Sequence, residues 1–293
     1  MIIAVASGKG GTGKTTVATN IAALLAEGGR DIFYVDCDVE EPDGKLFLKP
    51  EMTRGKTIKV PKPEIDADKC DGCALCREIC QYNAIVVILE KAMAFHELCH
   101  SCGGCRLVCP MKAIADTDVE IGAISEGKAG NLGFLHGELK VGTPSAVPLI
   151  RELKKEIPDS ADVILDAPAG ASCPVVETIS GSDFTALVTE PTPFGLNDLK
   201  IAVETVRILG IPFGVIINRS KSGYDIVNDF CRKEGIIVLG EIPDKRAAAE
   251  TYSKGEMLFR AIPGFRELFE NIYENIKIEI WKYKNSGEKG MAV

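Results

Sequence analysis

The sequence lacks any apolar run close to the roughly 18 to 20 residues that a membrane span requires. Its first six residues are apolar, but a glycine-rich segment follows at once, so no secretory signal peptide is expected. An excess of basic residues is also lacking, because 42 acidic and 34 basic residues leave a net charge of −8. This balance argues against binding to nucleic acid or to an anionic membrane surface, and the cytoplasm is the expected location.

Cysteine, in contrast, is abundant. The chain has 293 residues, 46% of them hydrophobic, which is enough for one large or two medium domains with a sizeable core. It has 11 cysteines, and most of them lie between Cys70 and Cys109. Disulfides are rare in reducing compartments, so this density indicates metal binding.

The segment from Gly8 to Thr15 fits the pattern G-x-x-x-x-G-K-[ST] of a phosphate-binding loop. It lies between a predicted buried strand, Ile2–Ala6, and a predicted helix, Thr15–Ala26. Its glycines let backbone N–H groups approach phosphate oxygens, while Lys14 reaches the β- and γ-phosphates and Thr15 holds Mg²⁺. The predicted nucleotide-binding residues of this loop are Gly8, Lys9, Gly10, Gly11, Thr12, Gly13, Lys14, Thr15 and Thr16.

Lys9, at the second position of the loop, is not required by the general pattern. The segment Gly8-Lys9-Gly10-Gly11 resembles the deviant Walker A loop of the MinD/ParA/nitrogenase iron-protein ATPases. This resemblance implies a homodimer with ATP at its interface, in which Lys9 reaches the nucleotide of the other subunit. The alternative is a lysine that is simply solvated on an exposed loop.

Two further strands are predicted to end in carboxylates. Asp36 and Asp38 end the strand that begins at Asp31, and Asp166 ends the strand that begins at Ala161. The strand–helix–strand start predicts a mostly parallel sheet, whose carboxyl edge binds ligands. By resemblance, Asp38 aligns the attacking water, Asp36 supports it, and Asp166 is the Walker B acid. The predicted catalytic residues are Lys9, Lys14, Asp38 and Asp166, and the predicted Mg²⁺ site is formed by Thr15, Asp38 and Asp166. The alternative for Asp36 and Asp38 is a pair of acids that only solvate a strand end.

The base site is predicted from Asn218 and Arg219, which follow the strand Phe213–Ile217, and from Pro243, which follows the next strand. These positions resemble the adenine pocket of the same family. The Asn-Lys-x-Asp guanine signature is absent at this place, so ATP is expected rather than GTP.

The central cysteines form two quartets with the spacing C-x2-C-x2-C-x3-C, which is the run found in bacterial ferredoxins. In that arrangement the fourth cysteine of each run folds back to the other cluster. The expected ligands are therefore crossed: Cys70, Cys73, Cys76 and Cys109 for cluster one, and Cys99, Cys102, Cys105 and Cys80 for cluster two. Two [4Fe–4S] clusters are favoured, and zinc is the alternative. His96 and His100 are expected to be surface or supporting residues rather than ligands.

Several other residues and segments give weaker indications of structure or function. Cys173 lies seven residues after Asp166, at the offset of a cluster ligand in the nitrogenase iron protein. For Cys173 and Cys37 two interpretations are therefore open: a ligand of a third, bridging cluster, or a buried structural thiol. His136 is expected in a loop with its hydrogen bonds satisfied, and Leu46–Leu48 as a short strand. The apolar stripe of residues 264–283 is expected to pack in the core rather than on a membrane.

The predicted fold is an α/β P-loop NTPase sheet, mostly parallel and flanked by helices, with an inserted small α+β ferredoxin-like domain. The ATPase domain is assigned to residues 1–59 and 119–284, the inserted domain to 60–118, and a disordered tail to 285–293. The resemblance implies an ATPase. We expect a nucleotide-gated electron carrier or reductase component for a metalloenzyme partner. The alternatives are an iron–sulfur cluster assembly or carrier ATPase, and a MinD-like regulatory or positioning switch with redox-sensing clusters.

Overall fold

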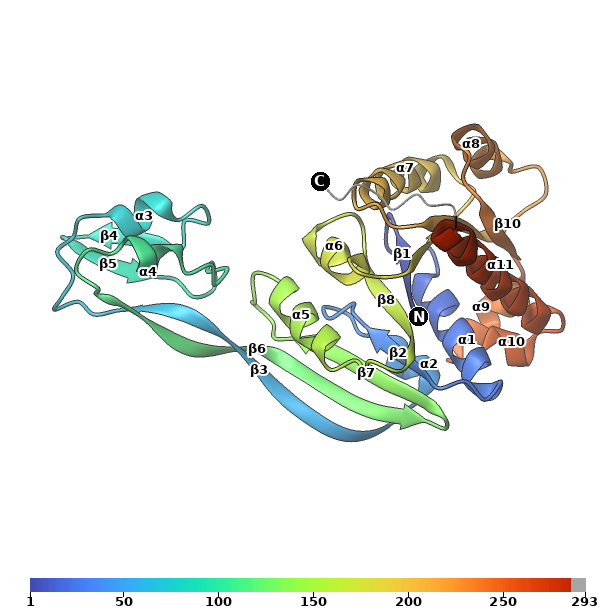
Figure 1. The fold of residues 1–293 in the computed structure, drawn as a ribbon, viewed down its shortest axis with the longest axis horizontal. Helices are drawn as coiled ribbons and strands as arrows, with labels where there is room; N and C mark the ends of the chain where they lie inside the picture. Colours follow the sequence, from blue (N-terminus) through green and yellow to red (C-terminus); the bar gives the residue numbers. More distant parts are fainter. Residues whose placement is uncertain (286–293) are drawn as a thin grey trace.

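The computed structural model describes residues 1–285. The predicted tail, 285–293, lies outside the described residues except for Asn285, the last residue of helix α11. Figure 1 shows a larger body and a small module, joined by a long two-stranded ribbon.

A single nine-stranded sheet forms the centre of the body and extends into the ribbon. In spatial order its strands are β11 (Val238–Pro243), β10 (Phe213–Ser220), β9 (Phe184–Thr189), β1 (Ile2–Ser7), β8 (Asp162–Ala169), β2 (Ile32–Asp36), β7 (Leu132–Leu139), β6 (Ile114–Ala129) and β3 (Glu51–Ile65). The seven strands from β11 to β7 are parallel, and β6 pairs antiparallel with both β7 and β3. Strands such as β1 and β9 are almost wholly apolar because helices cover both of their faces.

Helices form a layer on each side of the sheet. One face is covered by α1 (Lys14–Glu27), α2 (Gly44–Leu48), α9 (Arg246–Ser253), α10 (Leu258–Ala261) and α11 (Phe265–Asn285). Their apolar residues share one core with Tyr34 and Phe134 of the sheet. The other face is covered by α5 (Val147–Lys155), α6 (Cys173–Ile179), α7 (Pro193–Ile208) and α8 (Ile226–Glu234). The mostly parallel α/β sheet with flanking helices is therefore confirmed.

The apolar stripe of α11 faces the core, because Phe269, Ile272 and Ile276 are fully buried. Core packing of this helix is therefore confirmed. Among residues 1–285, none of the helices combines the length and apolar character needed to cross a membrane.

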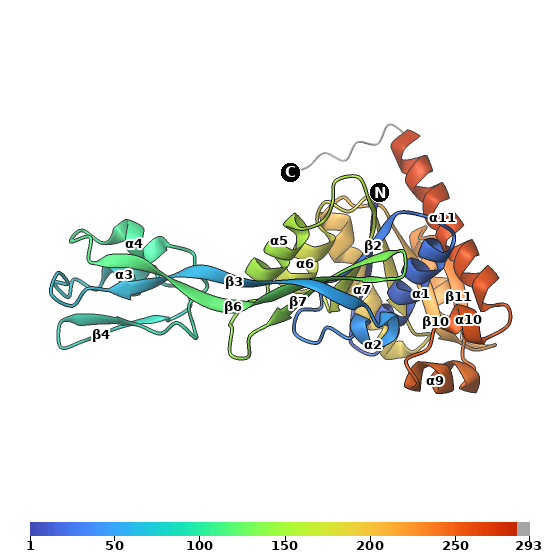
Figure 2. The ribbon, with the colours of Figure 1, turned by 90° about the horizontal axis from the view of Figure 1, so that it is seen from below.

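The small module contains α3 (Leu75–Ile79), α4 (Gly104–Val108) and a hairpin of β4 (Ile85–Ile88) and β5 (Lys91–Ala94). It has a core of its own, formed by Cys76, Ile85, Ala92 and Ile114. Figures 1 and 2 both show it at the far end of the twisted β3–β6 ribbon.

The ribbon is continuous from the pair Glu51–Lys128 to the pair Ile65–Ile114. The predicted domain limits, 59/60 and 118/119, fall inside β3 and β6, so the ribbon belongs to both parts and the division stays a prediction. Pro61 and Pro63 are tolerated because β3 is an edge strand.

Two local predictions were wrong. Leu46–Leu48 is helical, in α2, and Phe47 and Leu48 are buried in the core against α1. His136 lies on β7 rather than in a loop, is 6% exposed, and its Nδ1 has no hydrogen-bond partner in the described part of the chain. The propensity of short segments is overridden here by packing against the sheet.

Candidate functional site: a nucleotide cavity and two cysteine-lined cavities

The loop between β1 and α1 has the conformation that its glycines allow. Gly11 and Gly13 have φ of 77° and 90°, in the left-handed region that a Cβ disfavours. α1 begins at Lys14, and the N–H of Val17 donates to the carbonyl of Gly13. The loop therefore points unpaired backbone N–H groups and the positive end of α1 toward the cavity above it.

This loop forms one wall of a cavity of about 650 Å³ at the carboxyl edge of the sheet. Of the residues predicted to bind nucleotide or Mg²⁺, those that line it are Gly10, Gly11, Gly13, Lys14, Thr15, Thr16, Asp38, Asn218, Arg219 and Pro243. Gly8, Lys9, Thr12 and Asp166 do not line it. Residues from the loop after β2, from α9 and from the loop before α6 complete the wall, including Asp43, Tyr252 and Ser172. The cavity has the position and the phosphate-facing donors that a nucleoside triphosphate requires.

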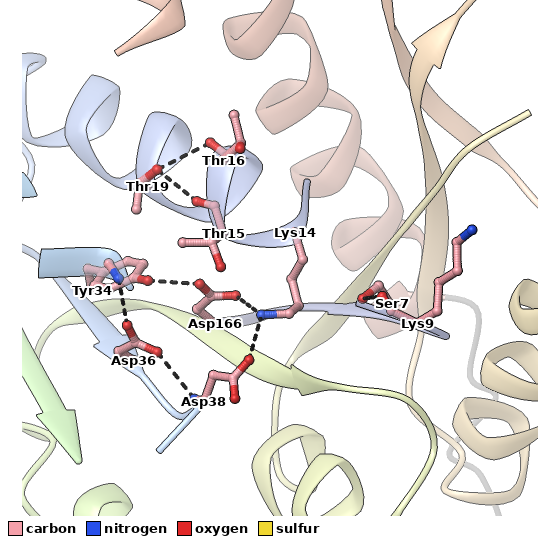
Figure 3. A network of polar contacts seen from close by, with 11 residues as sticks. Ser7, Lys9, Lys14, Thr15, Thr16, Thr19, Tyr34, Asp36, Asp38 and Asp166 are labelled. Carbon is pink, nitrogen blue, oxygen red and sulfur yellow. Dashed lines mark hydrogen bonds and ion pairs between the residues drawn. The ribbon is translucent and has the colours of Figure 1, made fainter. Parts of the chain in front are cut away.

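At the base of the cavity Lys14 is held by carboxylates (Figure 3). Its Nζ donates to Asp166 Oδ1 at 2.8 Å and lies 3.6 Å from Asp38 Oδ2. Burial lowers the pKa of Lys14, but Asp166 and Asp38 outweigh this and raise it above its ordinary value. The lysine is therefore charged, and it compensates buried acids that would otherwise be unpaired.

The two acids of the β2 end differ in environment. Asp36 is 1% exposed and accepts hydrogen bonds from the N–H of Asp38 at 3.2 Å and of Gly44 at 2.9 Å. Burial and the charge of Asp166 raise the pKa of Asp36 well above its usual range. Burial also raises the pKa of Asp38, to about 6, while Lys14 opposes the shift. Asp36 therefore fixes the turn, and Asp38 faces the cavity, which disfavours the view that both acids only solvate a strand end.

Lys9 points away from Lys14 in Figure 3. Its Nζ lies 3.8 Å from Glu190 Oε2, and the other oxygen of Glu190 accepts from Arg219 Nη1 at 2.6 Å. Glu190 was not singled out from the sequence, and it joins the loop lysine to the predicted base site. Within one chain, Lys9 does not reach the cavity that its own loop forms.

Asn218 is engaged with the loop itself. Its Nδ2 donates to the carbonyl of Thr12 at 2.7 Å, and its Oδ1 accepts from the N–H of Arg219 at 2.9 Å. The structure places Asn218, Arg219 and Pro243 together at one end of the cavity. Their role toward an adenine stays a prediction.

In the module, the eight quartet cysteines surround two cavities. One, of about 20 Å³, is lined by Cys70, Cys73, Cys76 and Cys109, and the other, of about 170 Å³, by Cys80, Cys99, Cys102 and Cys105. This is the crossed grouping. All eleven cysteines are free thiols, and no set of three or more metal-binding side chains among residues 1–285 converges as on a single ion. A four-iron cube is larger than an ion, so its four cysteine ligands need not converge on one point as the ligands of a single ion do.

Backbone donors already point at these sulfurs. The N–H of Ala84 donates to Cys80 Sγ at 3.4 Å, and that of Ala113 donates to Cys109 Sγ at 3.3 Å. Both bonds span four residues, so the two halves of the module repeat the same geometry. Such donors stabilise thiolate charge, which suits a metal cluster. His100 stacks on Tyr82 with ring centroids 3.7 Å apart, beside the second cavity.

The remaining candidate thiols lie elsewhere. Cys37 is buried, and burial followed by the charge of Asp36 raises its pKa far above the ordinary value. Cys173 is exposed at the start of α6, so the expectation of a buried thiol was wrong at that position. A bridging cluster at either residue is not tested by this geometry.

The comparison with known proteins settles the family. The profile of the CobQ/CobB/MinD/ParA nucleotide binding domain matches residues 3–259. The chain belongs to this family. It is thus a member of the P-loop ATPase superfamily that the loop and the sheet had indicated.

Three relatives cover most of this chain. An uncharacterized protein of Methanocaldococcus jannaschii is 28% identical over 289 residues, which is 96% of this chain and 98% of its own. An iron–sulfur cluster carrier protein of Pyrococcus horikoshii is 24% identical, over 94% of this chain and 86% of its own. Nitrogenase iron protein 2 of Methanothermococcus thermolithotrophicus is 25% identical, over 92% of this chain and 87% of its own.

Among solved structures, the cell division ATPase MinD of Pyrococcus furiosus is similar, with a TM-score of 0.60 and 21% identity. The similarity covers 94% of this chain and 98% of that chain. This similarity supports the mostly parallel α/β fold of the chain.

The packing of the phosphate-binding loop predicts that alanine substitutions at two of its glycines, Gly8 and Gly10, change the stability of the protein unequally. A Cβ on Gly8 would overlap the backbone carbonyl of Asp198 in α7, whereas a Cβ on Gly10 would meet no atom of residues 1–285 within 4 Å. We expect Gly8→Ala to lower the free energy of unfolding by about 1–3 kcal/mol, because loop and helix must separate. Gly10→Ala should change it by less than about 0.5 kcal/mol. Denaturant unfolding of the two variants checks this, and equal stabilities would contradict the packing argument.

Proposed function

We propose that this protein binds and hydrolyses ATP and carries two [4Fe–4S] clusters, and that the nucleotide state gates single-electron transfer from the clusters to a metalloenzyme partner. The observation that carries the proposal is the pair of cavities in the module, each lined by one crossed cysteine quartet. It stands in a chain whose body belongs to a nucleotide-binding family.

In this proposal the quartet of Cys70, Cys73, Cys76 and Cys109 holds one cluster and the quartet of Cys80, Cys99, Cys102 and Cys105 holds the other. Bound clusters of this type supply one-electron chemistry at low potential. The chain itself contributes the sulfur ligands, the N–H donors of Ala84 and Ala113, and the partial exposure of the cysteines to solvent. Cys73 and Cys102, one in each quartet, are exposed, which favours exchange of electrons with an outside partner.

For the nucleotide, we assign the triphosphate to the loop Gly8–Thr16 and the base to the end of the cavity at Asn218, Arg219 and Pro243. Thr15, Asp38 and Asp166 would hold Mg²⁺, which offsets phosphate charge when bound. Asp38 orients the attacking water from its position on the cavity wall. Lys14 moves its charge from Asp166 to the phosphates when they occupy the loop.

A homodimer gives Lys9 its role. Within one chain Lys9 is held at Glu190, turned from its own cavity, and its side chain is 33% exposed. We therefore propose that it reaches the nucleotide of a second copy of this chain. The resemblance of Gly8-Lys9-Gly10-Gly11 to the deviant Walker A loop favours an assembly of this kind.

Contact between the module and the body supports gating. Cys99, His100 and Ser101 face Thr143, Pro144 and Ser145 across a small cavity. The next residue, Ala146, lines the nucleotide cavity, where the segment enters α5. Lys62 of the ribbon, 4% exposed, fixes this side of the module by donating to the carbonyl of His96 at 2.5 Å. One short segment thus runs from the small cavity beside Cys99 to the wall of the nucleotide cavity.

The experiment is anaerobic iron and sulfide analysis, followed by EPR of the dithionite-reduced protein with and without MgATP. We expect about eight irons per chain, and a spectrum or a rate of electron transfer to an external acceptor that changes with ATP. A matched Lys14→Ala sample should not respond. Zinc in place of iron would overturn the redox proposal, and acceptor rates indifferent to ATP, ADP and dimer state would overturn gating.

A cluster carrier is the second candidate, favoured by the similarity to the carrier protein of Pyrococcus horikoshii. Electron transfer is preferred because complete quartets bind clusters tightly, and because no cysteine pair follows Cys173; Cys231 stands alone. Transfer of intact clusters to an apo acceptor protein would reverse this preference. A regulatory or positioning switch with redox-sensing clusters is the third, and the similarity to MinD favours it.

A further inference from the structure

A tyrosine hydroxyl is buried beneath the nucleotide cavity. Tyr34, on β2, is fully buried, and its hydroxyl donates to Asp166 Oδ2 at 2.8 Å (Figure 3). The other oxygen of the same carboxylate accepts from Lys14 at 2.8 Å. Asp166 itself is 0% exposed, so these two donors, one for each oxygen, fix its carboxylate.

The tyrosine ring is fixed in turn. It stacks on Phe134 of β7, with centroids 5.7 Å apart and an interplanar angle of 18°. On another side it meets the start of α2, where a Cβ on Gly44 would overlap the ring and its hydroxyl. The position of the hydroxyl is therefore determined by the sheet and by the helix that follows the cavity-lining loop.

Packing alone does not require the hydroxyl. The surrounding core is apolar, and a phenylalanine would fill the same space without bringing a polar group that must find a partner. Among residues 1–285, the one hydrogen-bond partner of the hydroxyl is Asp166, the predicted Walker B acid. Burial, followed by the charge of Asp166, raises the pKa of Tyr34 well above its ordinary value, so the hydroxyl stays a donor at neutral pH.

We propose that Tyr34 is a positioning residue of the nucleotide site, whose hydroxyl fixes the rotation of the Asp166 carboxylate so that Oδ1 alone faces the cavity side. Lys14 occupies Oδ1 in this structure. When Lys14 turns to phosphate, the same oxygen is left aimed at the place where Mg²⁺ is expected. The inference rests on the proposed binding of MgATP, because it assigns Asp166 to that site.

The test is Tyr34→Phe in the full-length chain, with binding of a non-hydrolysable ATP analogue measured as a function of Mg²⁺ concentration. Hydrogen bonds to charged groups are stronger than those to neutral groups, so we expect the Mg²⁺ concentration for half-maximal binding to rise about tenfold or more. Affinity for the analogue without Mg²⁺ should be unchanged, because the residues of the loop are intact. A purely structural role would instead move both quantities together.

Tyr273→Phe is the matched control. Tyr273 is 2% exposed in the same core, and its hydroxyl accepts from Arg30 Nη1 at 3.0 Å, outside the nucleotide cavity. It should lose stability but keep wild-type Mg²⁺ dependence. Wild-type Mg²⁺ dependence in Tyr34→Phe, or equal shifts in both variants, would overturn the role of Tyr34. Wild-type protein that shows no Mg²⁺-dependent binding would overturn the proposed function itself, and this inference with it.

Discussion

Lys14→Ala is expected to abolish ATP binding and hydrolysis, with at least a hundredfold loss of nucleotide affinity. Lys14 is the one side chain of the loop that places a full positive charge at the base of the cavity, and phosphate charge would go unmatched there without it. Equilibrium binding of a labelled ATP analogue with Mg²⁺ measures the effect directly. Retention of affinity within about tenfold would show that the triphosphate does not lie on this loop.

The same substitution is expected to destabilise the nucleotide-free protein. Asp36 and Asp166 are buried, Asp38 is partly so, and Lys14 is the cation among them. Breaking a buried ion pair by removing one partner costs about 3–5 kcal/mol, because the other charge is left uncompensated.

A double variant separates the two roles of Lys14. Lys14→Ala combined with Asp166→Asn removes both members of the closest pair, so part of the lost unfolding free energy should return. ATP affinity should not return, since the charge that meets phosphate is still missing. Chemical unfolding and nucleotide binding on the wild type and three variants complete the cycle. Recovery of both quantities together would mean that Lys14 acts only through the fold.

The sequence was sufficient to predict the parts of this site that depend on local pattern and on strand direction. The loop Gly8–Thr15 follows a buried strand, and Asp38 and Asp166 follow or end two others. Because parallel strands bring their carboxyl ends to one edge, these side chains were expected to meet, and Lys14 does lie between Asp38 and Asp166. The order of the cysteines likewise predicted the crossed grouping around two cavities.

What the sequence did not predict depends on register and on long-range packing. Tyr34 reaches Asp166 because β2 and β8 pair with Asp36 opposite Asp166, an alignment that strand identity alone does not fix. A signal existed: Tyr34 is a hydroxyl-bearing residue in an otherwise apolar strand, on the same face as Asp36. Glu190 as the partner of Lys9 and Arg219 had no such signal, since both cations lie far from it in sequence.

The full length of β3 and its pairing with β6 were not predicted from the sequence either. β3 contains exposed charges and two prolines, so it resembles a linker, and only pairing with β6 over its whole length makes it a strand. Edge strands are defined by their neighbour rather than by their own hydrophobic pattern.

The second large effect is expected in the module, where pairs of cysteine substitutions should separate crossed from uncrossed ligation. Cys80 and Cys102 line the same cavity, although they belong to different sequence quartets. The double variant Cys80→Ala/Cys102→Ala should therefore lose one cluster and keep about half of the wild-type iron. Cys109→Ala/Cys102→Ala damages both cavities and should lose nearly all of it. Uncrossed ligation predicts the opposite result, because Cys102 and Cys109 would then serve one cluster and Cys80 the other.

Cys231→Ala, which removes a buried thiol on α8 outside the module, is the control and should keep full iron content. Iron and sulfide analysis after anaerobic reconstitution distinguishes the two arrangements, and iron content unchanged in every variant would exclude these cysteines as ligands.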